Sequence, residues 1–277
     1  MRVFIRDNYD DLSSTAAGFI CDVIKASESK ESKMVNIAFP SGRSVIGLYR
    51  ELGRLCGEEG GVSFKNVRAF HLDEYCGLEE EDKMCQKNWM KKNLYDKIDI
   101  DPKNVHYLNP WIGSDKYEEE CSRFESLIES SGGLDFAFFG TGADGHVARN
   151  EPGSSLKSVS RVHRLAYDTI MQLKDRWGRE TVPEEALTMG METIFKAKQV
   201  LVLFAGVSRS HALERCLEEA VNHMFPVSCF QKHTNCVFLA DEPATYELRV
   251  KTVSYFKGIE KTSEEVFGDP IHGKERL

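Results

Sequence analysis

Apolar runs of strand length recur along the chain, and several are apolar at every position instead of alternating with polar residues. That pattern is typical of strands buried on both faces of a parallel sheet. Between the runs, apolar residues recur every three to four positions, which predicts amphipathic helices. Because strands alternate with helices, we expect a three-layer α/β/α, Rossmann-like fold with an open, mostly parallel sheet and helices on both faces. The expected strands are 2–5, 35–39, 67–72, 134–139, 200–205 and 236–240, and the expected helices are 11–24, 45–55, 117–128 and 208–221.

No repeat, linker or shift in composition divides the 277 residues, so we expect a single domain over 1–277. The segment 243–259 mixes helical and strand patterns and does not predict either. Residues 262–277 are polar and are expected to form a flexible C-terminal tail.

The composition, with 41% hydrophobic and 29% charged residues, is ordinary for a globular protein. The net charge of −8 excludes a general nucleic-acid binder, since phosphate neutralisation needs a basic surface. No stretch reaches the roughly 20 apolar residues that span a bilayer, and the N-terminus lacks the apolar region of a signal peptide, so no membrane partner is expected. The eight cysteines form no C-x-x-C pair, which predicts small apolar side chains in the reducing cytoplasm.

Two loops that each follow an expected strand and precede an expected helix share hydroxyls, a glycine and one arginine. Such a turn can offer backbone N–H groups and a local positive charge to a phosphate. The alternative is simple helix capping, by Ser44 in the first loop and by Ser208 in the second. The polar members are Ser41, Gly42, Arg43 and Ser44 in the first loop and Gly206, Ser208, Arg209 and Ser210 in the second.

Adjacent carboxylates, Asp73 and Glu74, follow the expected strand at 67–72. One of them could be desolvated and tuned as a general base. The alternative is a solvated acidic turn.

The loop after the strand at 134–139 matches G-x-G-x-x-G, the motif that is typical of a dinucleotide-binding site. We discount that interpretation because Asn150 and Pro152 interrupt the helix on which a pyrophosphate would sit. The loop also holds Asp144, His146 and Glu151, and a histidine bracketed by carboxylates suits proton transfer near neutral pH. No H-E-x-x-H motif supports a metal site.

Several stretches resemble the glucosamine-6-phosphate deaminase (isomerising) family, whose fold is shared with 6-phosphogluconolactonases. The similarity runs from near the N-terminus to about residue 260. The residues that carry it are Leu72-Asp73-Glu74-Tyr75, Gly142-Ala143-Asp144-Gly145-His146-Val147-Ala148, Asn150-Glu151-Pro152, Ser154-Ser155, Val221-Asn222-His223-Met224, Asp241-Glu242-Pro243-Ala244-Thr245 and Val250-Lys251-Thr252-Val253-Ser254-Tyr255-Phe256.

The resemblance implies conversion of glucosamine 6-phosphate and water to fructose 6-phosphate and ammonia in amino-sugar catabolism, with no metal and no other cofactor. It implies that Asp73 is the general base that moves a proton between C2 and C1 of the sugar. His146 would protonate the ring oxygen, with Asp144 and Glu151 holding and charging it. The residues that fall on the family's phosphate loops are Ser41, Gly42, Ser44 and Arg209, and Arg176 corresponds to a further phosphate-binding arginine.

The chain departs from the family at three positions that face the expected substrate. Arg43 stands where the family has a glycine, and it would either strengthen phosphate binding or crowd the pocket. Arg149 replaces an aromatic residue, which puts sugar-ring packing in question. Arg209 replaces the phosphate-binding lysine, so charge is kept but geometry is not.

Some family members are hexamers activated by N-acetylglucosamine 6-phosphate, so the resemblance implies a homo-oligomer and an allosteric site. His163 stands where those members have a lysine, so the charge there would depend on pH. The residues that correspond to the allosteric site are Met1, Ser154, Ser155, Arg161, His163 and Tyr255.

Two other functions stay open. The first is a related isomerase or hydrolase acting on another phosphosugar, 6-phosphogluconolactonase-like or with an altered hexosamine phosphate, which Arg43 and Arg149 motivate. The second is a catalytically weak phosphosugar sensor, against which the complete acid–base set argues.

Overall fold

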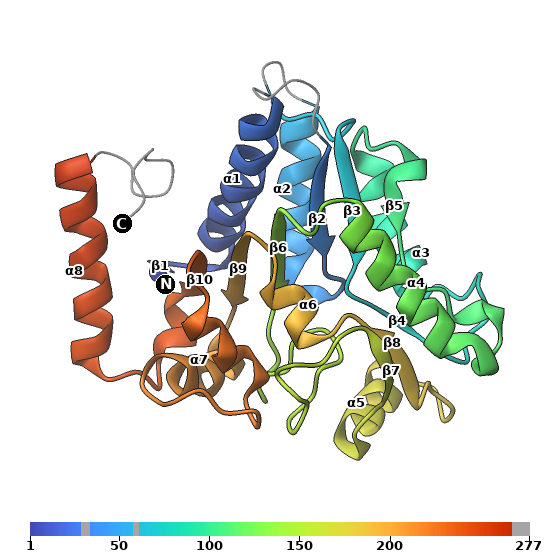
Figure 1. Ribbon diagram of the computed structural model, residues 1–277. Coiled ribbons are helices and arrows are strands. Elements are labelled where there is room, and N and C mark those ends of the chain that lie inside the picture. The colour runs from blue at the N-terminus through green and yellow to red at the C-terminus, as the bar shows by residue number, and fades with distance from the viewer. Residues whose placement is uncertain (29–33, 58–60, 268–277) are drawn as a thin grey trace.

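The computed structural model describes residues 1–28, 34–57 and 61–267, and a seven-stranded parallel sheet forms the centre of that part (Figure 1). Its strands lie in the order β1-β10-β9-β6-β2-β3-β5, and each neighbouring pair is parallel. The strands are β1 (Arg2–Arg6), β2 (Val35–Phe39), β3 (Val67–His71), β5 (Val105–His106), β6 (Phe136–Gly140), β9 (Gln199–Phe204) and β10 (Cys236–Asp241). All six expected strands are confirmed, and β5, with two residues, is too short to predict.

Helices cover both faces of the sheet, so the three-layer prediction is confirmed (Figure 1). Successive strand residues point to opposite faces. In β6, Phe136 and Phe138 pack in the cluster with α1 and α2, whereas Ala137 and Phe139 pack in the cluster with α4, α6 and α7. The helices are α1 (Tyr9–Glu28), α2 (Ile46–Cys56), α3 (Gln86–Asn93), α4 (Tyr117–Ser130), α5 (Tyr167–Trp177), α6 (Met191–Phe195), α7 (Ser210–Leu217) and α8 (Val250–Phe267).

A second, antiparallel sheet of three strands lies at the carboxyl edge of the main sheet and was not predicted. It consists of β4 (Asp73–Tyr75), β8 (Glu185–Thr188) and β7 (Arg161–Arg164), in that order. Leu187 in β8 belongs to the same core cluster as Phe139 of the main sheet, so the two sheets share one core. Asp73 and Thr188 are directly opposite each other in this sheet.

The C-terminal segment corrects two expectations. Residues from 250 on form α8, which continues through 262 to Phe267, so the start of the expected tail is helical. The remainder of that tail lies outside the described residues. The expected helix at 208–221 ends at Leu217, and the side chain of the next residue, Glu218, accepts hydrogen bonds from Arg249 N (2.9 Å) and Thr252 Oγ1 (2.5 Å) at the start of α8.

All eight cysteines are free thiols, and all but Cys56 are buried, as expected for small apolar side chains. Within the residues that the structure describes, no helix has the length and apolarity needed to cross a membrane.

Candidate active site

The sheet order brings the loops of interest to one edge. Strands β9, β6, β2 and β3 are neighbours and parallel, so the loops that follow them gather at their carboxyl ends. The loops also touch: the Arg209 Nε donates to the Thr141 carbonyl at 3.3 Å, across the β9 and β6 loops. A Cβ on Gly140 would lie 2.3 Å from Ser44 Oγ, so this glycine is what allows the β2 loop to approach β6.

The two arginine loops share one backbone design. Gly42 (φ 113°) and Gly206 (φ 82°) each stand in a left-handed conformation that favours glycine, and each starts a short 3-10 turn that runs into α2 or α7. Neither turn has a side-chain cap, so the alternative interpretation of Ser44 and Ser208 as helix caps is wrong.

Three arginines converge in front of these loops. Burial, together with the nearby Arg43 and Arg176, lowers the pKa of Arg209. Burial and the nearby Arg43 likewise lower the pKa of Arg176, which reaches the site from α5. Cations gathered and partly desolvated in this way are stabilised by an anion, so the arrangement suits a phosphate group.

His146 and Asp144 form a close pair in the glycine loop after β6. The His146 Nδ1 and the Asp144 Oδ1 are 2.7 Å apart. Burial acts to raise the pKa of Asp144, but its hydrogen bond and charge interaction with His146 lower it overall. Gly142 makes the pair possible, since a Cβ there would lie 2.2 Å from His146 Nδ1. The carboxylate therefore fixes the orientation of the imidazole.

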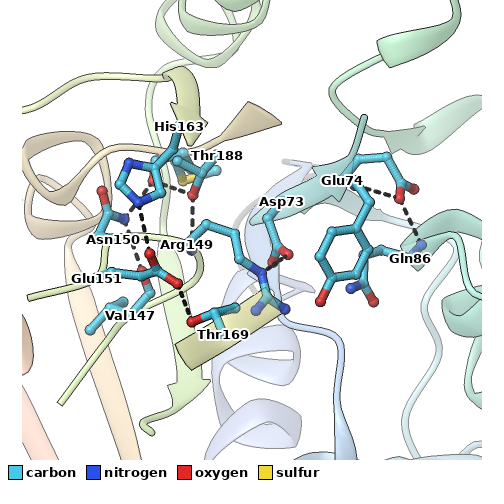
Figure 2. A network of polar contacts seen from close by, with 12 residues as sticks. Asp73, Glu74, Gln86, Val147, Arg149, Asn150, Glu151, His163, Thr169 and Thr188 are labelled. Atoms are coloured by element: carbon cyan, nitrogen blue, oxygen red, sulfur yellow. Dashed lines mark hydrogen bonds and ion pairs between the residues drawn. The ribbon is translucent and has the colours of Figure 1, made fainter. Parts of the chain in front are cut away.

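Glu151 does not hold His146, contrary to the expectation from the sequence. Its Oε2 accepts from Ala166 N at 2.7 Å and lies 3.2 Å from His163 Nε2 (Figure 2). Its Oε1 accepts a hydrogen bond from the Thr169 hydroxyl. Burial acts to raise the pKa of Glu151, and the His163 and Thr169 hydrogen bonds lower it overall. Because Ala166 and Thr169 lie at the start of α5, Glu151 fastens the N-terminus of the helix that carries Arg176.

Asp73 lies in β4 and pairs with Arg149, a contact that the sequence did not predict. Arg149 Nε donates to Asp73 Oδ2 at 2.9 Å, and the carboxylate is only 5% exposed (Figure 2). The guanidinium also lies over the ring of Tyr75, 4.8 Å from its centroid. Burial acts to lower the pKa of Arg149, but Tyr75 and Asp73 raise it overall, so the guanidinium is charged.

Glu74, the neighbour of Asp73, has a structural role. Its carboxylate accepts from Tyr75 N (2.8 Å), Gln86 N (2.8 Å) and Lys87 N (2.7 Å), and so holds the first residues of α3 (Figure 2). Burial raises the pKa of Glu74 to about 7, although these three N–H groups lower it. Both carboxylates are buried, so the solvated acidic turn is excluded.

The structure brings together only part of the expected allosteric set. Arg161 Nη2 donates to Ser154 Oγ at 3.2 Å, and Ser155 Oγ accepts from Lys157 N at 3.2 Å, both beside the small sheet. Met1 precedes β1 and Tyr255 lies on α8, on the opposite side of the molecule (Figure 1). Within one chain these residues do not form one site.

No group of three or more His, Cys, Asp or Glu side chains among the described residues is placed to hold a metal ion. No helix follows the glycine loop until α5 at Tyr167, which agrees with discounting a dinucleotide site.

The chain matches the family model described as glucosamine-6-phosphate isomerases/6-phosphogluconolactonase over residues 7–239. It is 40% identical over 274 residues to glucosamine-6-phosphate deaminase 2 of Mus musculus, covering 98% of each protein. It is 39% identical over 275 residues to glucosamine-6-phosphate deaminase of Drosophila melanogaster, covering 99% of each. A solved monomeric glucosamine-6-phosphate deaminase superposes with a TM-score of 0.83 at 33% identity, over 90% of this chain and 100% of that one. A 6-phosphogluconolactonase from Trypanosoma brucei, 20% identical over 90% of this chain and 98% of that one with a TM-score of 0.69, shares the fold.

Proposed function

The chain belongs to the glucosamine-6-phosphate isomerase/6-phosphogluconolactonase family, and we propose that it converts glucosamine 6-phosphate and water to fructose 6-phosphate and ammonia. The observation that carries this proposal is the gathering of Asp73, the His146–Asp144 pair and three arginines at one edge of the sheet. Relatives about 40% identical over nearly the full length are glucosamine-6-phosphate deaminases. Because the two sheets share one core, we treat 1–277 as one domain of this kind.

The phosphate of the sugar binds between the two glycine-led loops. Arg43, Arg176 and Arg209 supply the positive charge that the acidic chain as a whole lacks. Ser41, Gly42 and Ser44 supply hydroxyls and backbone N–H groups at the start of α2, where the helix dipole favours an anion. The nearness of Arg43 to Arg176 and Arg209 supports a role for it in strengthening phosphate binding.

The acid–base groups carry out two proton transfers. His146, oriented by Asp144, donates a proton to the ring oxygen, and the sugar opens to its aldehyde as the C1 hydroxyl loses its proton. Asp73 then removes the proton from C2 and delivers it to C1. The C1 oxygen gains a proton and the amine loses one, so the 2-amino aldose becomes a 2-imino sugar. Water adds to the C2=N bond and ammonia leaves, so that fructose 6-phosphate remains. Each carbon-bound proton that is removed is returned, and no electrons are exchanged with a cofactor.

Glu151 acts on this site through α5. Its contacts with Ala166 and Thr169 fix the helix from which Arg176 reaches the phosphate site. We therefore assign Glu151 a positioning role for phosphate binding in the geometry seen here.

The test is product formation with a matched catalytic control. Purified protein is incubated with glucosamine 6-phosphate, and ammonia and fructose 6-phosphate are measured by separate coupled assays. The two products should appear in equal amounts, and Asp73→Asn should reduce their rate by at least about a hundredfold. Wild-type turnover no faster than that of Asp73→Asn would reject the proposal.

A second candidate, a relative acting on a different phosphosugar, is favoured by one specific observation. Arg149 is ion-paired with the proposed base, so its guanidinium stands at the sugar end of the site. Turnover measured on a panel of amino and non-amino hexose 6-phosphates separates the candidates. Selective turnover of glucosamine 6-phosphate supports the first, and selective turnover of a non-amino sugar supports the second.

We propose that the chain forms a homo-oligomer, for which a hexamer is one candidate form, and that a regulatory phosphosugar site is completed by a neighbouring subunit. Exposed apolar side chains on α8, among them Val250, Tyr255 and Ile259, support association. Met1 and Tyr255 lie far from Ser154 and Arg161 within one chain, so a joint site needs two subunits. Sedimentation velocity with and without N-acetylglucosamine 6-phosphate, paired with rate measurements, tests both points. A monomer whose rate is insensitive to that sugar would reject them.

The proposed compartment is the cytoplasm. Eight cysteines without a disulfide fit a reducing environment. Cell fractionation followed by the deaminase assay tests this, and activity confined to a secreted or organellar fraction would contradict it.

A further inference from the structure

The ion pair between Asp73 and Arg149 is the feature of the candidate site that the proposed reaction leaves unexplained. Among the described residues, Arg149 is the one side chain that hydrogen bonds to Asp73, with its Nε 2.9 Å from Oδ2. Both partners are largely buried, at 18% and 5% exposure. The proposed base therefore already has a positive counter-ion before any sugar is bound.

The backbone around Arg149 fixes this side chain in place. Val147 and Asn150 pair across a tight turn, so Ala148 and Arg149 are its two central residues. Ala148 takes a left-handed conformation (φ 53°), which is strained for a residue with a side chain and marks a constrained turn. Arg149 N donates to Thr188 Oγ1 at 3.1 Å, and Thr188 is the residue opposite Asp73 in the small sheet. The turn thus directs the guanidinium at the base.

Further contacts hold the guanidinium itself. It lies on the face of Tyr75, whose ring meets Trp177 edge-on at 5.3 Å. Besides Asp73, the charged groups that act on it are Glu151, which attracts it, and Arg176, which repels it. The guanidinium is therefore a preorganised positive charge beside Asp73, held there by the Nε hydrogen bond and by the ring of Tyr75.

We propose that Arg149 is a specificity-determining residue: it serves as the counter-ion of Asp73 and disfavours a positive charge on the C2 substituent of the sugar. The inference rests on the proposed function, because that reaction places C1 and C2 at the Asp73 carboxylate. An ammonium at C2 would have Asp73 as its natural ion-pair partner, and in this chain Arg149 holds that position. The site therefore takes a 2-amino sugar with its amine uncharged, and accommodates a neutral 2-hydroxyl equally well.

Two unreactive analogues that differ only at C2 test this proposal. Glucitol 6-phosphate carries a neutral hydroxyl at C2, and 2-amino-2-deoxyglucitol 6-phosphate carries an ammonium at pH 7; neither has a carbonyl, so neither can isomerise. Dissociation constants are measured by titration calorimetry on the full chain. The wild type should bind the neutral analogue at least as tightly as the cationic one. Arg149→Met keeps the packing on Tyr75 and removes the charge, and should shift the ratio of the two constants toward the cationic analogue by about tenfold to a hundredfold.

Two more variants separate charge from packing. Arg149→Lys restores the positive charge and should restore the wild-type ratio. Arg164→Met removes an arginine that is 78% exposed in β7 and pairs with Glu184 at 3.5 Å, and should leave the ratio unchanged.

Three results would overturn the proposal. The first is a wild-type protein that binds the cationic analogue at least tenfold more tightly than the neutral one, a result that needs no variant. An equal loss of affinity for both analogues in Arg149→Met would show a purely structural role. Failure of both analogues to bind the wild type would reject the phosphosugar site itself, and with it the proposed function, whereas binding with an unchanged ratio rejects this inference alone.

Discussion

Gly142→Ala is the sharpest single perturbation of the proposed acid group. Gly142 has no positive φ, so alanine fits the backbone there and the effect is purely steric. Its Cβ would lie 2.2 Å from both Cε1 and Nδ1 of His146 and 2.4 Å from Asp144 Oδ1, well inside the 3.0 Å that real contacts keep. Clearing that overlap needs a displacement of close to an ångström.

The size of the expected effect follows from that displacement. The His146–Asp144 contact is 2.7 Å, and moving either group by about 1 Å takes it beyond hydrogen-bonding distance. A misplacement of about 1 Å at a catalytic group costs on the order of a hundredfold in rate, or about 2.7 kcal/mol. We expect kcat to fall by about that factor with little change in KM, because the arginines that bind the phosphate are untouched.

Steady-state kinetics on glucosamine 6-phosphate, together with thermal unfolding, measures this. Gly258→Ala is the matched control, since its Cβ would meet nothing within 4 Å, and it should leave kcat unchanged. Gly140→Ala provides a contrast in the neighbouring loop: its Cβ would meet Ser44 Oγ at 2.3 Å, so KM should rise more than kcat falls. A folded Gly142→Ala protein with wild-type kcat would refute the assignment of the His146–Asp144 pair.

Three further predictions concern the phosphate site, a buried carboxyl and the core. Arg209→Ala should raise KM by about tenfold to a hundredfold, because a charge-assisted contact to the phosphate is lost, and Arg209→Lys should have an intermediate KM. An unchanged KM in steady-state assays would contradict the assignment of Arg209 to phosphate binding. Because the pKa of Glu74 is raised from 4.5 to about 7, the native state binds the proton more tightly, so the free energy of unfolding should fall as pH rises from about 5 to 7. Urea titrations at several pH values should show that fall flattened in Glu74→Gln, and an identical slope would argue against a protonated Glu74. Phe138→Ala removes a fully buried ring that meets Phe39 edge-on at 5.3 Å, and should lower the free energy of unfolding in urea by about 3–5 kcal/mol. Replacing the exposed Tyr246 by alanine should lower it by less than about 0.5 kcal/mol. Equal losses in the two variants would contradict the packing described.

The main sheet could be predicted from the sequence because its strands are buried on both faces. Runs such as Val200 to Phe204 are apolar at every position, a pattern that indicates a strand in the middle of a parallel sheet. The small sheet could not be predicted in the same way. Its strands are short and carry charged residues, as in Asp73–Tyr75 and Arg161–Arg164, and their stability depends on packing against a core that only the folded chain provides.

The site was predictable as a set of residue types but not as a set of contacts. The glycine loop places Asp144 two positions from His146, so that pair follows from local spacing. Glu151 lies only five positions after His146, yet its partners Ala166 and Thr169 lie at the start of a helix 15 to 18 residues further on. The contact between Arg149 and Asp73 joins positions 76 residues apart, and no local pattern signals it.

The measurement that tests the central claim most directly is the fate of the C2 proton. Glucosamine 6-phosphate is converted in D2O, and the products are examined by NMR together with an ammonia assay. One base that removes the C2 proton and delivers a proton to C1 predicts fructose 6-phosphate with deuterium at C1 up to one atom per molecule and one ammonia per sugar. With Asp73→Asn, both products should form at least about a hundredfold more slowly. Ammonia released without any fructose 6-phosphate, whether labelled at C1 or not, would contradict the account. Products formed by Asp73→Asn at the wild-type rate would contradict it as well.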